Sequence, residues 1–117
     1  MKRLLIVEDS PVLRLTLVAA CEDAGFAVIE AWDGRDALVK VGMHHPDLIL
    51  CDLMMPTMNG VDFLAHVQAH PDHGRIPVII MTRYHEAAAA LPPSIPVLIK
   101  PFQLAELLAM VHEQLSH

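Results

Sequence analysis

Short, largely apolar runs recur along this chain, and each is separated from the next by a helical pattern. Five such runs occupy residues 3–7, 27–31, 48–51, 78–81 and 97–99. Strands that are apolar at nearly every position are typical of a parallel sheet buried on both faces, because no position of such a strand meets water. Parallel neighbours need crossover connections, which helices supply with a right-handed sense. The pattern therefore predicts an α/β fold, a single (βα)5 doubly wound parallel sheet.

Local signals indicate where the first two helices begin and end. Ser10 followed by Pro11 is typical of a helix start, since serine caps the first turn and proline fits its first position. Gly25 stands where a glycine commonly ends a helix. By the same reasoning, Asp33 is predicted to begin the second helix and Gly42 to end it.

The sequence supports the later helices to different degrees. A helix is predicted over residues 60–70, and the clearest amphipathic pattern covers 104–115. Between them, the residue before a proline avoids helical geometry, so a fourth helix must end by about Ala90, ahead of Pro92. Only the stretch HEAAAA remains, and we predict a shortened fourth helix.

Composition narrows the function classes. The chain has 117 residues and a formal net charge of −6, from 8 Lys and Arg against 14 Asp and Glu. This length suits one domain, expected over residues 1–117, and the acidic balance argues against nucleic-acid binding. The start MKRLLIVEDS is too poor in apolar residues for a signal peptide, so a cytoplasmic protein without membrane contact is expected. Cys21 and Cys51 lie in apolar patterns, which favours reduced thiols in the core.

Chemically active residues gather at the ends of the predicted strands. Glu8 and Asp9 follow the first strand, Asp52 the third, Thr82 the fourth and Lys100 the fifth. In an open parallel sheet, ligands bind at the carboxyl ends of the strands, so these side chains are expected to meet. Three carboxylates within about 5 Å would repel by roughly 3 kcal/mol a pair at an effective dielectric constant of about 20. A divalent cation removes that cost, and oxygen ligands without His or Cys favour Mg²⁺.

Asp52 is the residue of this group that could act as a nucleophile. Its carboxylate can attack phosphorus and form an aspartyl phosphate, while Mg²⁺ and the Lys100 ammonium stabilise charge on the transferring oxygens. The Thr82 hydroxyl can hydrogen-bond a phosphoryl oxygen. Taken alone, an aspartate at a strand end is more often a turn or cap residue. The joint placement of acids, hydroxyl and amine at four strand ends indicates phosphoryl chemistry.

Four stretches of the sequence together resemble the receiver domain of two-component response regulators. IVED resembles the acidic pair of that family, DLMMPTMNG its phosphoacceptor loop, VIIMT its switch-threonine strand and LIKPF its lysine strand. The resemblance covers essentially the whole chain. It implies a flavodoxin-like sheet with strand order 2-1-3-4-5, and a cis bond between Lys100 and Pro101.

The resemblance also implies roles for individual residues. Asp52 is expected to receive its phosphoryl group from a sensor histidine kinase or phosphotransfer protein, and Thr82 and Lys100 to bind it. Such a domain is a signalling switch and not an enzyme for a separate substrate. A downstream protein is expected to bind through residues 83–102 and the last helix. The implied Mg²⁺ ligands are oxygen atoms of four residues: Glu8, Asp9, Asp52 and, through its backbone carbonyl, Met54.

Three departures from the family pattern fall in the region that normally meets partners. Arg83 follows the switch threonine, where the family usually has a small residue, and Tyr84 follows it. Val97 stands three positions before the lysine, where the family commonly has a rotating Tyr or Phe. The stretch between the threonine and the lysine is also shorter by roughly one helical turn. Arg83 could pair with the phosphoryl group or lie in solvent, Tyr84 could replace the missing aromatic, and unusual partner geometry is expected.

Other readings fit parts of the sequence. An adaptor that binds its partner regardless of phosphorylation is favoured by the altered segment 83–96. A small phosphatase with an aspartate nucleophile generally needs a second acid two residues later, and Met54 stands there instead. His66, His70 and His73 have a spacing that could bind zinc, but without Glu or Cys in register the favoured interpretation is exposed polar residues.

Overall fold

A computed structural model describes residues 1–55 and 58–116 and contains one five-stranded, all-parallel sheet. The order of the strands is β2-β1-β3-β4-β5, so the predicted fold class and strand order are confirmed. In this order, β1 and β3 are neighbours although one strand and two helices separate them in the chain. The strands are β1 (Arg3–Val7), β2 (Ala27–Ala31), β3 (Leu48–Asp52), β4 (Val78–Thr82) and β5 (Val97–Ile99).

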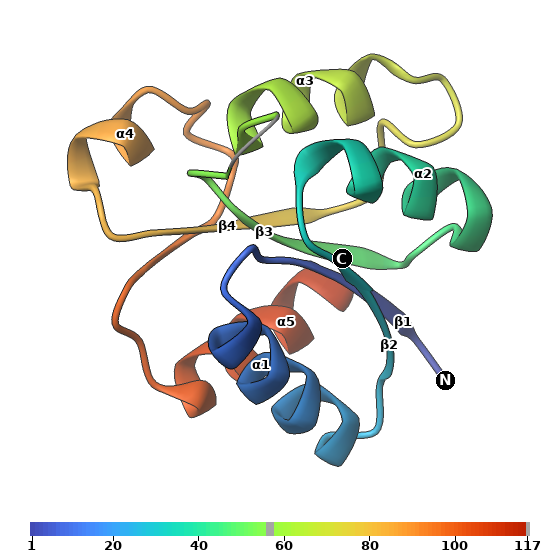
Figure 1. The fold of residues 1–117 in the computed structure, drawn as a ribbon, viewed down its shortest axis with the longest axis vertical. Coiled ribbons are helices and arrows are strands. Elements are labelled where there is room, and N and C mark those ends of the chain that lie inside the picture. Colours follow the sequence, from blue (N-terminus) through green and yellow to red (C-terminus); the bar gives the residue numbers. More distant parts are fainter. Residues whose placement is uncertain (56–57, 117) are drawn as a thin grey trace.

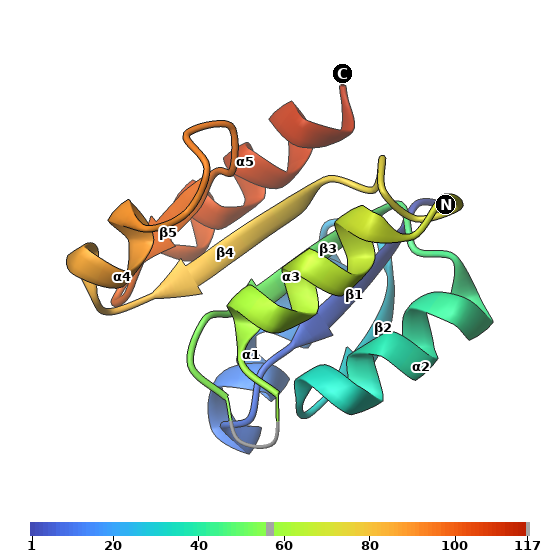
Figure 2. The same ribbon diagram turned by 90° about the horizontal axis from the view of Figure 1, so that it is seen from above.

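Helices cover both faces of the sheet. Figure 1 shows α2 and α3 on one face and α1 and α5 on the other, and Figure 2 shows the same layers from above. The short helix α4 lies beside the end of β4 (Figure 2). The helices are α1 (Pro11–Asp23), α2 (Gly34–His44), α3 (Gly60–Ala69), α4 (His85–Ala89) and α5 (Leu104–Leu115).

Two apolar clusters, one on each face of the sheet, form the core. Alternate residues of β1 pack into clusters on opposite faces of the sheet. Leu5 packs toward α2 and α3, whereas Leu4 packs toward α1 and α5. Every residue of β3 and β4 is buried, which explains why those strands read as continuous apolar runs. Cys21 and Cys51 are free thiols within these clusters, as expected, and burial raises the pKa of Cys21 to about 11.

The predicted starts of the first two helices are confirmed. The Ser10 hydroxyl oxygen accepts a hydrogen bond from the Leu13 N–H at 3.4 Å, and Pro11 occupies the first helical position. The Asp33 carboxylate accepts from a backbone N–H one turn into α2 at 2.8 Å. Gly25 has φ of 95°, a left-handed conformation that favours glycine, and the α1 helix ends just before it.

The predicted end of α2 at Gly42 is wrong. The helix continues to His44, and His45 ends it in the left-handed region with φ of 48°, while its N–H donates to the Val41 carbonyl at 3.0 Å. An interior glycine costs a helix only about 1 kcal/mol, which continued hydrogen bonding and the burial of Val41 offset. Pro46 explains the true end, because the residue before a proline avoids helical geometry.

The region between β4 and α5 follows the shortened pattern. Helix α4 has five residues, no side-chain cap at its start, and ends ahead of Pro92 as predicted. Leu91, which follows it, is buried against the cluster that α2 and α3 cover. The peptide bond between Lys100 and Pro101 is cis, as the resemblance implied. Within the described residues, no helix has the length and apolar character needed to cross a bilayer.

Candidate functional site

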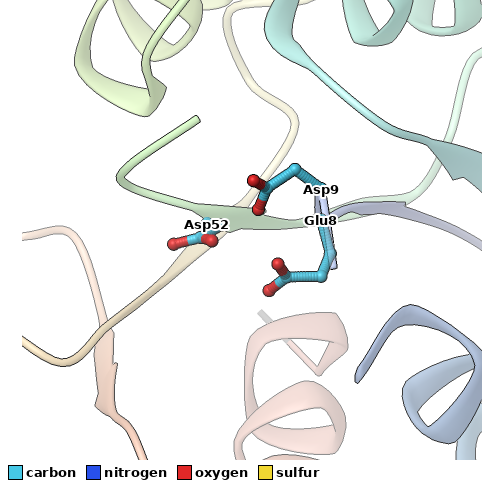
Figure 3. Close-up of side chains that lie close together, drawn as sticks. All are labelled: Glu8, Asp9 and Asp52. Carbon is cyan, nitrogen blue, oxygen red and sulfur yellow. The ribbon is translucent and has the colours of Figure 1, made fainter. Parts of the chain in front are cut away.

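Three carboxylates converge at the carboxyl edge of the sheet. Oxygen atoms of Glu8, Asp9 and Asp52 all lie within 4.8 Å of one another (Figure 3). The strand register explains this, since Val7 of β1 pairs with Cys51 of β3 and the acids that follow each residue therefore lie side by side. Glu8 and Asp52 are buried, whereas Asp9 is exposed. The sequence-predicted acid cluster is thus present as a spatial group.

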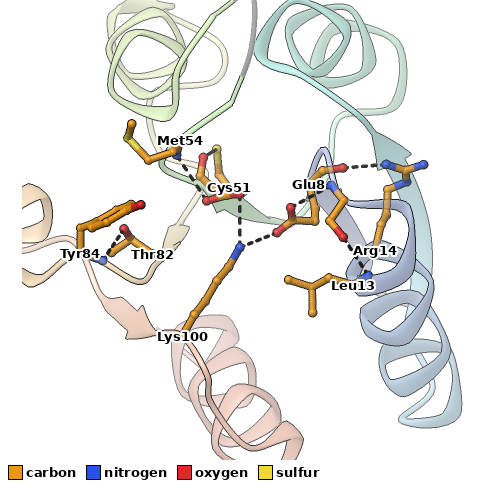
Figure 4. A network of polar contacts seen from close by, with 10 residues as sticks. Glu8, Leu13, Arg14, Cys51, Met54, Thr82, Tyr84 and Lys100 are labelled. Atoms are coloured by element: carbon orange, nitrogen blue, oxygen red, sulfur yellow. Dashed lines mark hydrogen bonds and ion pairs between the residues drawn. The ribbon is translucent and has the colours of Figure 1, made fainter.

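Lys100 connects two of these acids. Its Nζ donates hydrogen bonds to Glu8 Oε1 at 2.8 Å and to Asp52 Oδ2 at 3.2 Å (Figure 4). Burial acts to lower the pKa of Lys100, but the hydrogen bond to Glu8 and the negative charges of Asp52 and Glu8 outweigh it, so the pKa is raised. The ammonium therefore stays charged at neutral pH.

One ammonium does not balance the negative charge of three carboxylates, and the pKa of Asp9 reflects the excess negative charge. Although Asp9 as a whole is exposed, partial desolvation of its carboxyl, followed by the interaction with Glu8, raises its pKa, while its own backbone and the charge of Lys100 act against this. A cluster of oxygen donors without His or Cys, in which like charges repel, suits a hard divalent cation. The residues present therefore fit Mg²⁺, which the carboxylates of Glu8, Asp9 and Asp52 could hold.

The remaining groups around Asp52 are hydrogen-bonded in place. The Met54 N–H donates to Asp52 Oδ1 at 3.3 Å (Figure 4). Thr82 lies at the end of β4, next to β3 in the sheet, and is almost fully buried. Its Oγ1 accepts the Tyr84 N–H at 3.1 Å, so the hydroxyl proton can be donated to another group.

Gly60 allows the start of α3 to approach the end of β3 closely. Its N–H donates to the Leu53 carbonyl at 2.8 Å. A Cβ atom at this position would lie 2.6 Å from the backbone oxygen of Asp52 and 2.8 Å from the Leu53 Cα, closer than real contacts allow. Glycine is therefore required here by the approach of two backbone segments.

A cleft of about 470 Å³ opens above the acid cluster. It continues into an apolar groove of about 460 Å³ that Leu13, Phe102 and Leu104 help to line, and Arg83 and Lys100 border both. Arg83 and Tyr84 are exposed, and Val97 is half-buried. The cleft is lined by Glu8, Asp9, Ser10, Leu13, Asp52, Met54, Thr82, Arg83, Tyr84 and Lys100.

The sequence did not predict how Glu8 is held. Arg14 Nη1 donates to the Glu8 backbone carbonyl at 2.7 Å (Figure 4), and Arg14 Nε pairs with Glu30 Oε1 at 3.2 Å. The Ser10 N–H donates to Glu8 Oε2 at 3.1 Å, in addition to the predicted helix-capping role of Ser10. One signal in the sequence could have indicated this contact. Arg14 is a positive residue near the start of α1, where the helix dipole disfavours a positive charge unless it has a partner.

The flavodoxin-like sheet, the acid cluster and the lysine at its carboxyl edge together define a receiver-type fold. The family model of the response regulator receiver domain matches residues 4–112, and the chain belongs to this family. It is a receiver domain of the kind found in two-component systems, and receiver domains of response regulators interact with histidine kinases.

Individual relatives share this domain as one part of longer proteins. The chain is 42% identical over 80 residues to the Gliding motility regulatory protein of Myxococcus xanthus, and 37% identical over 118 residues to the Regulatory protein AtoC of Escherichia coli. These matches cover 68% and 97% of this chain, but only 10% and 25% of the respective relatives.

A solved structure supports the same fold. The receiver domain of the sensor histidine kinase PA1611 from Pseudomonas aeruginosa has a TM-score of 0.90 and 26% sequence identity, over 99% of this chain and 98% of that one. That structure holds a magnesium ion coordinated in its active-site cleft. Receiver domains typically bind Mg²⁺, and the acid cluster of this chain fits the ion.

Proposed function

We propose that this receiver domain is a phosphoryl-operated switch in which Asp52 accepts a phosphoryl group from a sensor histidine kinase or phosphotransfer protein. The observation that carries the proposal is the surrounding of Asp52: two further carboxylates within 4.8 Å and the Lys100 ammonium at 3.2 Å. The transfer is proposed to depend on Mg²⁺ and to take place in the cytoplasm. The net charge of −6 supports a protein partner and not a nucleic acid.

The reaction follows from the charges. A carboxylate oxygen of Asp52 attacks phosphorus, the P–N bond of the phosphohistidine breaks, and its electron pair goes to the imidazole of the donor. Lys100, whose Nζ lies 3.2 Å from Asp52 Oδ2, is proposed to pair with a phosphoryl oxygen. The Thr82 hydroxyl is proposed to donate to another phosphoryl oxygen, since its own oxygen already accepts the Tyr84 N–H.

The proposed metal ligands are Glu8, Asp9, Asp52 and the backbone carbonyl of Met54. Bound Mg²⁺ would neutralise negative charge on the carboxylates and on the transferring oxygens. Water is proposed to hydrolyse the aspartyl phosphate later. The domain thus catalyses only its own phosphorylation and dephosphorylation.

The output is proposed to pass through residues 83–102 and α5 to a downstream protein. Arg83 and Tyr84 border the cleft, and the Tyr84 backbone is bonded to Thr82. A doubly negative phosphoryl group next to Arg83 offers a new charge-assisted hydrogen bond. Residues 83–96 should therefore gain protection from hydrogen exchange on phosphorylation. Equal protection in both states would mean that the signal leaves by another face.

The experiment that tests phosphoryl uptake is intact mass spectrometry after incubation with Mg²⁺ and acetyl phosphate. The wild-type chain should gain one phosphoryl group, and an Asp52→Asn variant should gain none while keeping its fold. Asp23→Asn serves as a matched control, because Asp23 is an exposed acid at the end of α1. Uptake that persists in Asp52→Asn would place the acceptor elsewhere.

A phosphorylation-independent adaptor is a second candidate. It is favoured by the five-residue α4 without a side-chain cap, and by Val97 at the position where the family commonly has a rotating aromatic residue. An adaptor would bind its partner equally well as wild type and as Asp52→Asn, whereas a switch would lose the phosphate-dependent part of the affinity.

A further inference from the structure

Arg14 contacts the acid cluster without belonging to it. Its Nη1 donates to the Glu8 backbone carbonyl at 2.7 Å (Figure 4). Its Nε donates to Glu30 Oε1 at 3.2 Å. Two nitrogens of one guanidinium therefore connect the end of β1 to the edge strand β2. The proposed phosphoryl transfer assigns no part to Arg14 or to Glu30.

The carbonyl that Arg14 binds belongs to the peptide bond between Glu8 and Asp9, two of the three clustered acids. The sheet already holds Glu8 on one side, since its N–H donates to the Ala31 carbonyl at 3.0 Å. A peptide unit is planar, so a contact that fixes its oxygen also fixes the direction in which the chain continues into Asp9. Arg14 thus constrains both acids at the point where the chain leaves the sheet.

Glu30 orients the guanidinium. It lies in β2 in register with Ile6 of β1, and its backbone carbonyl accepts Lys40 Nζ at 2.7 Å. The side chain of Arg14 is only 17% exposed, whereas that of Glu30 is 44% exposed. The planar fork of an arginine can bind two acceptors at once, which a lysine ammonium cannot do with the same fixed geometry. The guanidinium is therefore held in one orientation between the two strands.

The positive charge of Arg14 opposes a cation at this site. Its Nη1 lies 2.7 Å from an atom of Glu8, one of the proposed Mg²⁺-binding residues, and like charges repel. Removal of this charge alone would therefore strengthen Mg²⁺ binding. A favourable contribution from Arg14 can come only through the peptide that it holds, so the sign of its effect on Mg²⁺ affinity distinguishes the two roles.

We propose that Arg14, oriented by Glu30, is a positioning residue of the Mg²⁺ site, which holds the peptide between Glu8 and Asp9 in the conformation that lets both carboxylates bind one ion. Groups that orient metal ligands in this indirect way typically contribute a factor of about 10 to 100 in metal affinity. The inference rests on the proposed function, because it concerns the Mg²⁺ ion proposed there.

Mg²⁺ titration of the full chain, followed by amide NMR spectra, tests the proposal. Arg14→Met should bind Mg²⁺ about tenfold more weakly than the wild type. Arg75→Met is the matched control, because it removes the same charge from an exposed position ahead of β4, at the opposite edge of the sheet. It should bind Mg²⁺ at least as tightly as the wild type.

The two ways in which this titration could contradict the account are distinct. Unchanged or tighter Mg²⁺ binding by Arg14→Met would overturn the positioning role alone. The absence of Mg²⁺ binding by the wild type would overturn the proposed Mg²⁺ site together with it.

A double-mutant cycle tests the part of Glu30. Glu30→Gln should weaken Mg²⁺ binding in the wild-type background, because the guanidinium loses its charged partner. In the Arg14→Met background the same change should have little further effect, since Glu30 acts through Arg14. Additive losses would show that Glu30 acts independently of Arg14 and would overturn its orienting role. Glu30 is exposed, so Glu30→Gln keeps the test valid if Arg14→Met does not fold.

Phosphoryl uptake from acetyl phosphate separates positioning from general damage to the site. In Arg14→Met, the Mg²⁺ concentration that gives half the maximal rate should rise about tenfold, while the rate at saturating Mg²⁺ should equal that of the wild type. A lower saturating rate with an unchanged Mg²⁺ requirement would overturn the proposal.

Discussion

Lys100 and Glu8, 92 positions apart in the chain, form an ion pair in which Nζ lies 2.8 Å from Oε1. The Glu8 side chain is only 1% exposed and that of Lys100 15%. Lys100 extends from the end of β5 to the end of β1, across the position of Asp52, and holds the acid cluster together. The proposed phosphate ligand is therefore also a structural partner of a buried carboxylate.

Lys100→Met should destabilise the domain strongly. Removal of one member of a buried pair leaves the other charge uncompensated, which typically costs about 3 kcal/mol or more of unfolding free energy. Lys40→Met is a comparison, because Lys40 forms an i,i+4 pair with Asp36 within α2, both partners keep contact with water, and helical pairs of this kind contribute below about 1 kcal/mol. Urea unfolding without Mg²⁺ measures both. Equal losses would contradict the structural role of Lys100.

Asp9→Asn should have the opposite effect in the absence of Mg²⁺. The pKa of Asp9 is raised in the folded state, so at pH 7 its negative charge disfavours folding, and this cost disappears at a pH below its ordinary pKa. The neutral amide should therefore raise the Tm. A Tm below that of the wild type in metal-free buffer would contradict the electrostatic account.

Mg²⁺ at about a hundred times its Kd should add about 2.7 kcal/mol to the unfolding free energy of the wild type. The gain should be smaller in Asp9→Asn and absent in the Glu8→Gln, Asp9→Asn double variant, because their ligand charge is reduced. The same gain in all three chains would place the ion elsewhere.

Two glycine substitutions should act in opposite directions. Gly60→Ala should destabilise by about 2 kcal/mol or more, since the new Cβ meets the Asp52 and Leu53 backbones. Gly42→Ala should stabilise by about 0.5–1 kcal/mol, because Gly42 lies inside α2 and no atom lies within 4 Å of the added methyl group. Urea unfolding measures the change in unfolding free energy of both variants. A change in the same direction in both would contradict this prediction.

Stability should fall as the pH drops below about 6.5, in part through His73. Burial, followed by the charges of His70 and His45, lowers the pKa of His73, while the charge of Asp72 acts against this. A depressed folded pKa contributes stability that is present above the ordinary value and is lost as the pH falls through the folded value.

The measurement is urea unfolding between about pH 7.5 and pH 5.5 with a metal chelator present. His73→Gln should lose less unfolding free energy over this interval than the wild type. A loss of the same size would show that other groups carry the pH dependence.

The sequence predicted most of the fold because burial of strands on both faces removes the alternation between apolar and polar residues. Five runs of this kind indicate a parallel α/β sheet, whose strand order came from the family resemblance, and the acids at the carboxyl ends of β1 and β3 then lie at the same edge. The end of α2 was mispredicted because a local glycine signal at Gly42 competed with the proline signal at Pro46, and continued hydrogen bonding favoured the latter.

The contacts that depend on side-chain reach could not be read from the sequence. Arg14 binds the Glu8 backbone and Lys100 pairs with Glu8 itself, and both contacts depend on rotamers that spacing does not determine. His45 and His73 meet only because α2 and α3 end at the same place. Pattern rules give positions along one element, whereas these contacts join different elements.

The central claim is that Asp52 is the phosphoryl acceptor. After incubation with Mg²⁺ and acetyl phosphate, borohydride reduction converts an aspartyl phosphate to homoserine, which peptide mass spectrometry locates in the sequence. We predict homoserine at position 52, and only in samples that contained Mg²⁺ and acetyl phosphate. Homoserine at any other aspartate, or none at position 52 in a chain that has gained a phosphoryl group, would contradict the account.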